Sequence, residues 1–295
     1  MTYAVIDIGT NTVRLCLYRI ENGKPKMVLN RRVMALLGSK VEDGALTNQG
    51  IDAVCGALES LMAQIRNEKV NHTLVFATAA LRNITNTEAV VLAIRERVGL
   101  DVHVLSGEEE ALLTFKGASK EQEISEGLIA DIGGGSTELV LIKDGGVVQT
   151  ASLPIGSLTA FVQFVKERPV HADAILAIRS YVRSMIKDHF SQEAKATVLY
   201  GIGGAARTAM ELEKILYPGA GGAIQTLETL LARLLDDEKL AETSILKASP
   251  ERLDAALPGV AILCEVAALF GCERLGVCRG GVREGYLWEQ LEKIG

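Results

Sequence analysis

The chain has 295 residues, of which 48% are hydrophobic and 23% charged, and its net charge at neutral pH is −6. These proportions are those of a globular protein and exclude a disordered or fibrous chain, and the length favours two domains over one. With six Phe, six Tyr and one Trp, the acidic chain also lacks the basic charge and the stacking aromatics of a general nucleic-acid-binding protein.

The N-terminal segment predicts neither a signal peptide nor a membrane span. It has no basic n-region, and Asp7, Asn11 and Arg14 interrupt its apolar stretch. The five cysteines are an odd number without a C-x-x-C pair, which fits neither a disulfide framework nor a zinc site. We therefore expect a cytoplasmic protein with no membrane partner, whose cysteines are small core residues.

Strands and helices alternate along the first part of the chain. After Thr47, apolar residues recur every three or four positions, which predicts an amphipathic helix. The alternation indicates an α/β protein. Apolar runs predict strands at 2–9, 13–20, from 25 onward after a turn at Asn22-Gly23, 72–78 and 101–106, and the helical pattern returns at 86–99 and 107–119.

The pattern of the N-terminus then occurs a second time. Asp7 and Asp131 are 124 positions apart, and at that offset Ile8-Gly9 meets Ile132-Gly133 and Thr12 meets Ser136. A duplicated domain is the simplest explanation. We expect a first domain at 1–125, a second at 126–285, and a C-terminal helix at about 286–295 that packs back on the first. In the second half the sequence predicts helices at 157–166 and 172–190, a strand at 197–202, a helical region to 234, a helix at 258–271, a strand at 273–277 and a closing helix at 281–294.

Each of the two repeated turns predicts a phosphate-binding loop. A strand ends in a carboxylate and is followed by small or hydroxyl residues whose backbone amides can approach an oxyanion closely. The loops are Gly9, Thr10, Asn11 and Thr12, and Gly133, Gly134, Gly135, Ser136 and Thr137. If Asp7 and Asp131 face the same ligand, a hard divalent cation must lie between them and the phosphate, and Mg²⁺ is the one that fits.

A third glycine-rich turn, at 201–207, follows a strand and opens a helix. It matches G-x-G-x-x-A, so a dinucleotide site has to be considered. The segment after it is helical where a second strand should follow, and no acidic residue is placed to hold a ribose. A dinucleotide site is therefore disfavoured, and it is the resemblance described next that implies phosphate binding by Gly203 and Gly204.

These three loops resemble those of the actin-like, sugar-kinase and Hsp70 superfamily. The whole chain resembles the exopolyphosphatase and guanosine pentaphosphate phosphohydrolase family in its short, two-domain form. The motifs that carry the resemblance, in the family's order, are DIGTNTVRL, ATAALRN, SGEEEA, DIGGGSTE, SLPIGS, GIGGAAR, RLDAALPG and GVREG. The resemblance implies duplicated actin-like (ribonuclease H-like) α/β domains flanking an interdomain cleft.

By the same resemblance Glu110 matches the catalytic base that activates water. Asp131 and Glu138 match metal-associated and water-positioning acids, Asp7 is the corresponding acid of the first domain, and Arg82 matches a residue that reaches phosphate. Taken alone, Glu108, Glu109 and Glu110 form the acidic first turn of a helix. From the residues alone, any one of the three could point inward.

The expected function is Mg²⁺-dependent release of orthophosphate from the end of inorganic polyphosphate. The alternatives are a phosphohydrolase acting on guanosine pentaphosphate (pppGpp), an ATP-using enzyme of the same superfamily, or a non-catalytic sensor of polyphosphate or alarmones. A homodimer is expected from the general frequency of such assemblies.

A basic helix face suggests a path for polyphosphate to the site. Arg179, Arg183 and Lys187 are spaced by four and share one side of the helix predicted at 172–190. We hypothesise that this face attracts polyphosphate toward Asp131.

Overall fold

The computed structural model describes residues 1–294 and divides into two compact units. The first is Met1–Glu110 with the residues from Glu289 on, and the second is Ala111–Trp288. The chain passes between the units inside helices α4 (Gly107–Glu121) and α11 (Val282–Ile294), not near residue 125. Because both helices continue through the boundary, no loop or linker marks it in the sequence. The cleft expected between the units stays a prediction.

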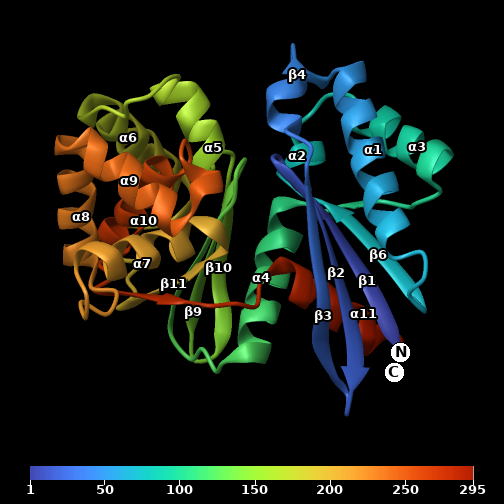
Figure 1. The fold of residues 1–295 in the computed structure, drawn as a ribbon. Coiled ribbons are helices and arrows are strands. Elements are labelled where there is room, and N and C mark those ends of the chain that lie inside the picture. The colour runs from blue at the N-terminus through green and yellow to red at the C-terminus, as the bar shows by residue number, and fades with distance from the viewer. Residues whose placement is uncertain (295) are drawn as a thin grey trace. The chain divides into compact units, whose positions relative to one another are not determined.

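The first unit is built on a five-stranded sheet of order β3-β2-β1-β6-β7 (Figure 1). Strand β1 pairs antiparallel with β2 and parallel with β6. The β2–β3 hairpin turns at Asn22 and Gly23, whose φ angles of +52° and +74° are those of the turn that Asn-Gly favours. The strands are β1 (Thr2–Ile8), β2 (Thr12–Glu21), β3 (Lys24–Met34), β6 (His72–Ala77) and β7 (His103–Val104).

Two helices cover one face of this sheet. Helix α1 (Asn48–Gln64) begins where expected, because the Thr47 hydroxyl accepts the Gly50 amide at 3.2 Å. The buried side chains of α1 and α3 (Thr87–Val98) form one core with those of Ile6, Ile8 and Leu15. Short elements that the apolar pattern did not predict complete the unit: the 3₁₀ turn Leu37–Lys40, β4 (Val41–Glu42), β5 (Ala45–Leu46) and α2 (Ala79–Arg82).

The second unit repeats the sheet of the first. Its strand order, β10-β9-β8-β11-β12, matches the other sheet strand for strand, with the same antiparallel and parallel pairings. The duplicated α/β fold expected from the internal repeat is therefore confirmed. The strands are β8 (Gly127–Ile132), β9 (Thr137–Lys143), β10 (Gly146–Leu153), β11 (Val198–Ile202) and β12 (Arg274–Val277).

Helices lie on both faces of the second sheet (Figure 1). One face packs against a large helical core centred on α10 (Ala256–Phe270), which is buried along almost its whole length. The other face packs against Ala111 and Ala118 of α4. The remaining helices are α5 (Ser157–Ala160), a π-helical turn at Phe161–Val165, α6 (Ala172–His189), α7 (Gly203–Leu216), α8 (Ile224–Asp236) and α9 (Glu238–Ala248).

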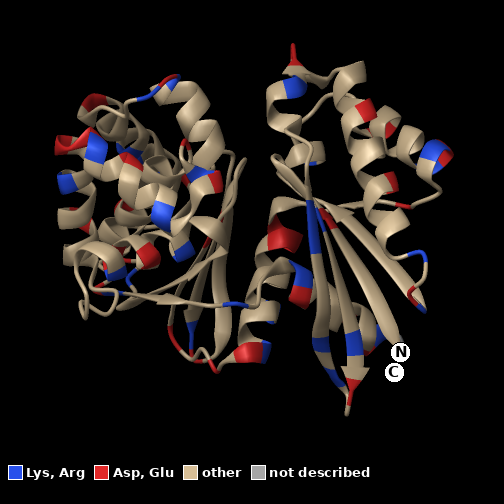
Figure 2. Ribbon diagram, viewed as in Figure 1, with Lys and Arg blue, Asp and Glu red and all other residues tan. Residues whose placement is uncertain are grey.

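Helix α6 carries an ion-pair network where a polyphosphate track was expected. Arg179 and Arg183 both donate to Glu265 of α10, at 2.9 and 2.6 Å, and Arg179 also binds Glu228 of α8 with two hydrogen bonds. Lys and Arg alternate with Asp and Glu over these helices (Figure 2). The hypothesis of a basic track on this face is therefore wrong, because its arginines bind carboxylates of neighbouring helices.

All five cysteines are buried and unpaired, as expected for core residues. Among residues 1–294, no helix is both long and apolar enough to cross a membrane.

Candidate functional site

Each of the two predicted phosphate loops contains the same kind of backbone hydrogen bond, from its first glycine to the residue three positions later. The Gly9 amide donates to the Thr12 carbonyl at 3.1 Å, and the Gly133 amide donates to the Ser136 carbonyl at 3.0 Å. A Cβ at either glycine would lie 3.2 or 3.3 Å from that carbonyl oxygen, so both turns are close-packed. The loops are thus structurally equivalent, each between the first two strands of its sheet.

The carbonyl groups of the second loop are turned to α5. The Gly133 carbonyl accepts from the amide and hydroxyl of Ser157, and the Gly134 carbonyl accepts from the amides of Leu158 and Thr159. Within the described chain, the amides of Gly134 and Gly135 donate to no protein acceptor. These two amides are therefore available to an oxyanion.

The side chain of Thr137 supports this loop. Thr137 is fully buried, and its hydroxyl donates to the Ile155 carbonyl at 2.7 Å. This hydrogen bond joins the start of β9 to the chain before α5. Phosphate binding by Thr137 and by Ser136, which is 4% exposed, stays a prediction.

Asp131 and Glu138 are neighbours on one face of the second sheet. The β8–β9 register places them directly opposite each other, and the β9–β10 register places Ser152 beside Glu138. The Ser152 hydroxyl donates to Glu138 Oε1 at 2.8 Å, and Glu138 is 2% exposed. Two acids that were predicted for different roles are thus adjacent, and Ser152 positions Glu138.

The third glycine turn makes room for two charged side chains. Gly203 has a φ of +82°, and a Cβ there would lie 2.7 Å from Asp131 Oδ1. A Cβ at Gly204 would lie 2.0 Å from Arg252 Nη1. The space beside the two glycines holds Asp131 and Arg252. Phosphate binding by Gly203 and Gly204 themselves stays a prediction.

Arg252 and Arg207 are two cations near this turn that were not among the residues predicted from the motifs. Arg252 Nη2 donates to the Ser157 hydroxyl at 3.0 Å, and its Nε is buried without a hydrogen-bond partner. Burial, with a smaller contribution from Arg207, lowers the pKa of Arg252 to about 10, and burial also lowers the pKa of Arg207. Both remain charged at neutral pH, so they can bind an anion. The sequence contained a signal for both arginines, because Arg207 is the last residue of the motif GIGGAAR and Arg252 is the first residue of the motif RLDAALPG.

In the first unit, two glutamates of the first turn of α4 have different roles. Ser106 and Glu109 form a capping box: the Ser106 hydroxyl accepts the Glu109 amide at 3.1 Å, and Glu109 accepts the Ser106 amide at 2.8 Å. This backbone hydrogen bond lowers the pKa of Glu109. Glu110 is the inward residue, 6% exposed, and Arg82 Nη1 donates to its Oε2 at 2.6 Å.

Arg82 holds Glu110 in place. The same Nη1 also donates to the Leu105 carbonyl at 3.1 Å, at the end of the segment that leads into α4. The structure brings Arg82 against the predicted base. The direct contact of Arg82 with phosphate that the resemblance implies stays a prediction.

The first loop and Asp7 lie beside arginines. The β1–β2 register places Arg14 directly opposite Asp7, and the β2–β3 register places Arg32 opposite Arg14. Asn11 Oδ1 is buried without a hydrogen-bond partner. An orphaned polar atom in this turn is consistent with a ligand at the first loop.

The carboxylates of Asp131 and Glu138 fit a magnesium site that has few protein ligands. In the described part of the chain, no group of three or more His, Cys, Asp or Glu side chains converges on a point. Mg²⁺ normally takes one or two carboxylates and fills its other positions with water and phosphate oxygens. The Asp131–Glu138 pair meets that requirement. Sharing of one ion by Asp7 and Asp131 stays a prediction.

The sequence pattern of the Ppx/GppA phosphatase family matches residues 16–294. The chain belongs to this family. The Ppx/GppA assignment confirms the resemblance drawn from the motifs, and the Ppx/GppA relatives named below are hydrolases.

Two Ppx/GppA relatives differ in length. A guanosine-5'-triphosphate,3'-diphosphate pyrophosphatase of Vibrio atlanticus is 25% identical over 99% of this chain, which spans only 60% of that protein. A Haemophilus influenzae protein, provisionally named an exopolyphosphatase, is 24% identical over 98% of this chain and 91% of its own length.

Solved Ppx/GppA structures resemble the whole chain. The Aquifex aeolicus family member is 26% identical with a TM-score of 0.82, and it covers 100% of this chain and 99% of its own. An exopolyphosphatase from Cytophaga hutchinsonii shares the fold, with 23% identity, a TM-score of 0.85 and 99% and 98% coverage.

Proposed function

We propose that the chain hydrolyses a terminal phosphoanhydride bond, with inorganic polyphosphate as substrate and Glu110 as general base. The observation that carries the proposal is the setting of Glu110: a buried carboxylate at the start of α4, held by Arg82, while the adjacent Glu109 is used in the helix cap. A general base needs a fixed position near the water that it deprotonates.

In the proposed reaction, Glu110 takes a proton from a water molecule whose oxygen attacks the terminal phosphorus. A new P–O bond forms as the bridging P–O bond breaks, and the pair of electrons of the broken bond stays on the shortened chain. The products are orthophosphate and a polyphosphate one unit shorter. Positioning and electrostatic stabilisation supply most of the rate in such reactions.

Phosphate binding falls to the residues around the second loop. The amides of Gly134 and Gly135 and the guanidinium groups of Arg252 and Arg207 all donate hydrogen bonds and carry positive potential. Arg252 is buried beside Gly204 and bound to Ser157, so its position is set before a ligand arrives. A preorganised donor costs no reorganisation in the transition state.

Asp131 and Glu138 would hold Mg²⁺. When bound, the ion neutralises charge on the phosphate oxygens. The chain's own part is to keep the two carboxylates on adjacent strands, with Ser152 orienting Glu138.

The name of one relative supports polyphosphate as the substrate. The Haemophilus protein carries the exopolyphosphatase name, whereas the Vibrio proteins are named pyrophosphatases of a guanosine nucleotide. The second candidate is hydrolysis of pppGpp, which the Vibrio names favour.

One assay tests the proposal: orthophosphate release measured side by side from polyphosphate, pppGpp and ATP with Mg²⁺ present. We expect the highest kcat/KM with polyphosphate. A higher kcat/KM with pppGpp would favour the second candidate, and formation of ADP from ATP would favour an ATP-using enzyme. Binding of polyphosphate or pppGpp without turnover would favour the non-catalytic sensor.

A further inference from the structure

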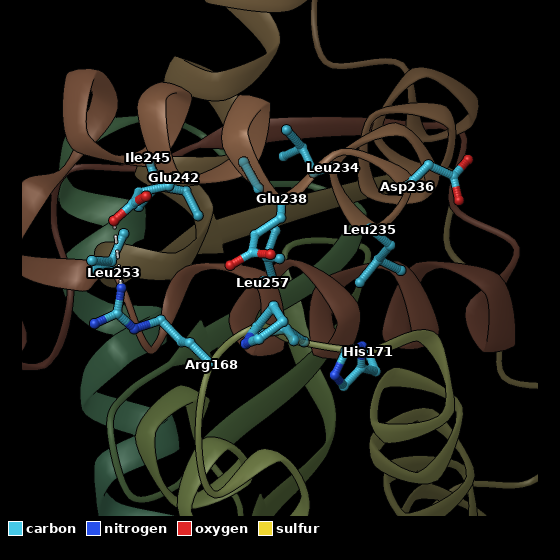
Figure 3. A pocket seen from close by; sticks show the side chains of 13 residues that line it. Arg168, His171, Leu234, Leu235, Asp236, Glu238, Glu242, Ile245, Leu253 and Leu257 are labelled. Carbon is cyan, nitrogen blue, oxygen red and sulfur yellow. Dashed lines mark ion pairs between the residues drawn. The ribbon is translucent and has the colours of Figure 1, made fainter.

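The second unit contains a pocket of about 210 Å³ outside the residues described so far. It lies between α8 and α9, the segment 168–171 and the start of α10 (Figure 3). None of the candidate catalytic, metal or phosphate-binding residues lines it. This volume lies below the range of sites for drug-sized ligands, so the pocket fits only a small organic molecule of fragment size.

The floor of the pocket is apolar. Leu234, Ala241, Ile245 and Leu257 line it and are each less than 8% exposed. Because these side chains come from three helices of one core, they form a preorganised surface on which an apolar ligand body can be buried.

The rim of the pocket is acidic. Its one lining guanidinium, Arg168, is neutralised by Asp254, with Nε and Oδ1 3.0 Å apart, and lies 3.8 Å from Glu242. Glu238 makes no ion pair within residues 1–294. Figure 3 shows its carboxylate over Leu257, among the lining residues, whereas the Asp236 carboxylate points away from them. The ligand would therefore meet a carboxylate without an ion-pair partner above an apolar floor.

We propose that this pocket binds a small organic cation, in which a primary ammonium group pairs with Glu238 and an apolar body covers Leu257. A neutral molecule of the same shape would gain the apolar contact but not the charge pairing. An anion would be repelled by Glu238 and Glu242, and it could not use Arg168, whose charge is already paired.

The pocket lies beside the phosphate-binding residues without including them. The segment that carries Arg168 also carries Ser157, and the segment that carries Asp254 also carries Arg252. One contact, Arg252–Ser157, joins these segments at the phosphate side, and another, Arg168–Asp254, joins them at the pocket side. Because no candidate catalytic residue lines the pocket, its occupancy can be measured by ligand binding alone, independently of the proposed hydrolysis.

The test uses three probes of nearly equal shape and different charge: 2-phenylethylammonium, 2-phenylethanol and phenylacetate. Each is titrated into the full chain and followed by ligand-observed NMR. We expect the ammonium to bind most tightly, the alcohol more weakly and phenylacetate least. Equal binding of the three probes, or no binding of the ammonium, would overturn the proposal.

Variants then locate the site. Glu238→Gln should weaken binding of the ammonium by about three- to fivefold, the size expected for one partly exposed charge pair, and should leave the alcohol unchanged. Glu193→Gln, which removes an exposed carboxylate outside the pocket, is the matched control and should change neither. Ala241→Leu should fill the floor and abolish binding of both probes, with circular dichroism reporting the fold. If Ala241→Leu does not fold, Glu238→Gln still decides, because unchanged ammonium binding in that variant contradicts the proposal.

Discussion

At the scale of single residues, Arg252 carries a buried charge that lowers the stability of the fold, and phosphate binding would explain why it is there. Its guanidinium is buried, and burial together with Arg207 lowers its pKa to about 10. A cation in such a place destabilises the fold unless an anion joins it. We infer that phosphate is the missing partner.

This inference predicts that Arg252→Met keeps or raises the melting temperature while it removes stabilisation by phosphate. Methionine has a similar length and no charge to desolvate. Thermal melts with and without inorganic phosphate measure both effects. Arg274→Met, which removes an exposed arginine of β12, is the control and should keep the phosphate-dependent shift. A variant that melts much lower and keeps the shift would contradict the role given to Arg252.

Glu109 and Glu110 show what the sequence could and could not decide. The S-x-x-E spacing of Ser106 and Glu109 predicts a capping box, and it would have removed Glu109 from the candidate bases. The contact between Arg82 and Glu110 spans 28 positions and depends on how α2 packs beside the start of α4. No local pattern reports such a contact.

At the scale of elements, the first turn of α7 is shaped around Arg252. Gly204→Ala should displace the guanidinium, because the new Cβ would lie 2.0 Å from Nη1. We expect kcat/KM for polyphosphate to fall by about tenfold, comparable to the loss of one charge-assisted hydrogen bond, with little change in stability.

Gly56→Ala is the matched control for this substitution. Gly56 lies within α1, and a Cβ there would meet nothing within 4 Å. The change should leave kcat/KM unaltered and raise the free energy of unfolding by about 0.5–1 kcal/mol. Equal activity of the two variants would contradict the role of Gly204.

The network between α6, α8 and α10 makes a second prediction at this scale. Glu265 is fully buried and accepts from both Arg179 and Arg183. Glu265→Gln should lower the free energy of unfolding by about 1.5–3 kcal/mol, because Arg179 and Arg183 each lose a charge-assisted hydrogen bond, while Arg179 keeps its pairing with Glu228. Urea unfolding measures the loss, with Glu193→Gln as a control that should change little. Unchanged stability would show that the network contributes nothing.

The same network explains why the basic-track hypothesis failed. A spacing of four correctly places Arg179 and Arg183 on one side of α6. It cannot reveal that Glu265, 82 positions beyond Arg183, arrives on that side from α10. Periodicity predicts which residues share a face, but the partner of that face depends on tertiary packing.

At the scale of the whole molecule, the internal repeat was enough to predict two sheets of equal order. The equivalence extends to the hydrogen bonds at Gly9 and Gly133, which are also 124 positions apart. The unit boundaries were less predictable, because α4 and α11 run through them as unbroken helices. Apolar periodicity marks where elements lie but does not divide a continuous helix.

A prediction at this scale concerns the metal. Asp131→Asn should raise the Mg²⁺ concentration needed for half-maximal orthophosphate release by at least about tenfold, because one charge of the proposed site is lost. A Mg²⁺ titration of the rate in both proteins measures the change. An unaltered Mg²⁺ dependence would remove Asp131 from the metal site.

The central claim is that Glu110, and not its neighbour, is the base. The most direct test compares orthophosphate release from polyphosphate by Glu110→Gln and Glu109→Gln. Glutamine at position 109 can still accept the capping hydrogen bond, so that variant should keep near wild-type kcat. Glu110→Gln should lose at least about a hundredfold in kcat with KM within a few fold. Near wild-type turnover by Glu110→Gln, or an equal loss in both variants, would contradict the account.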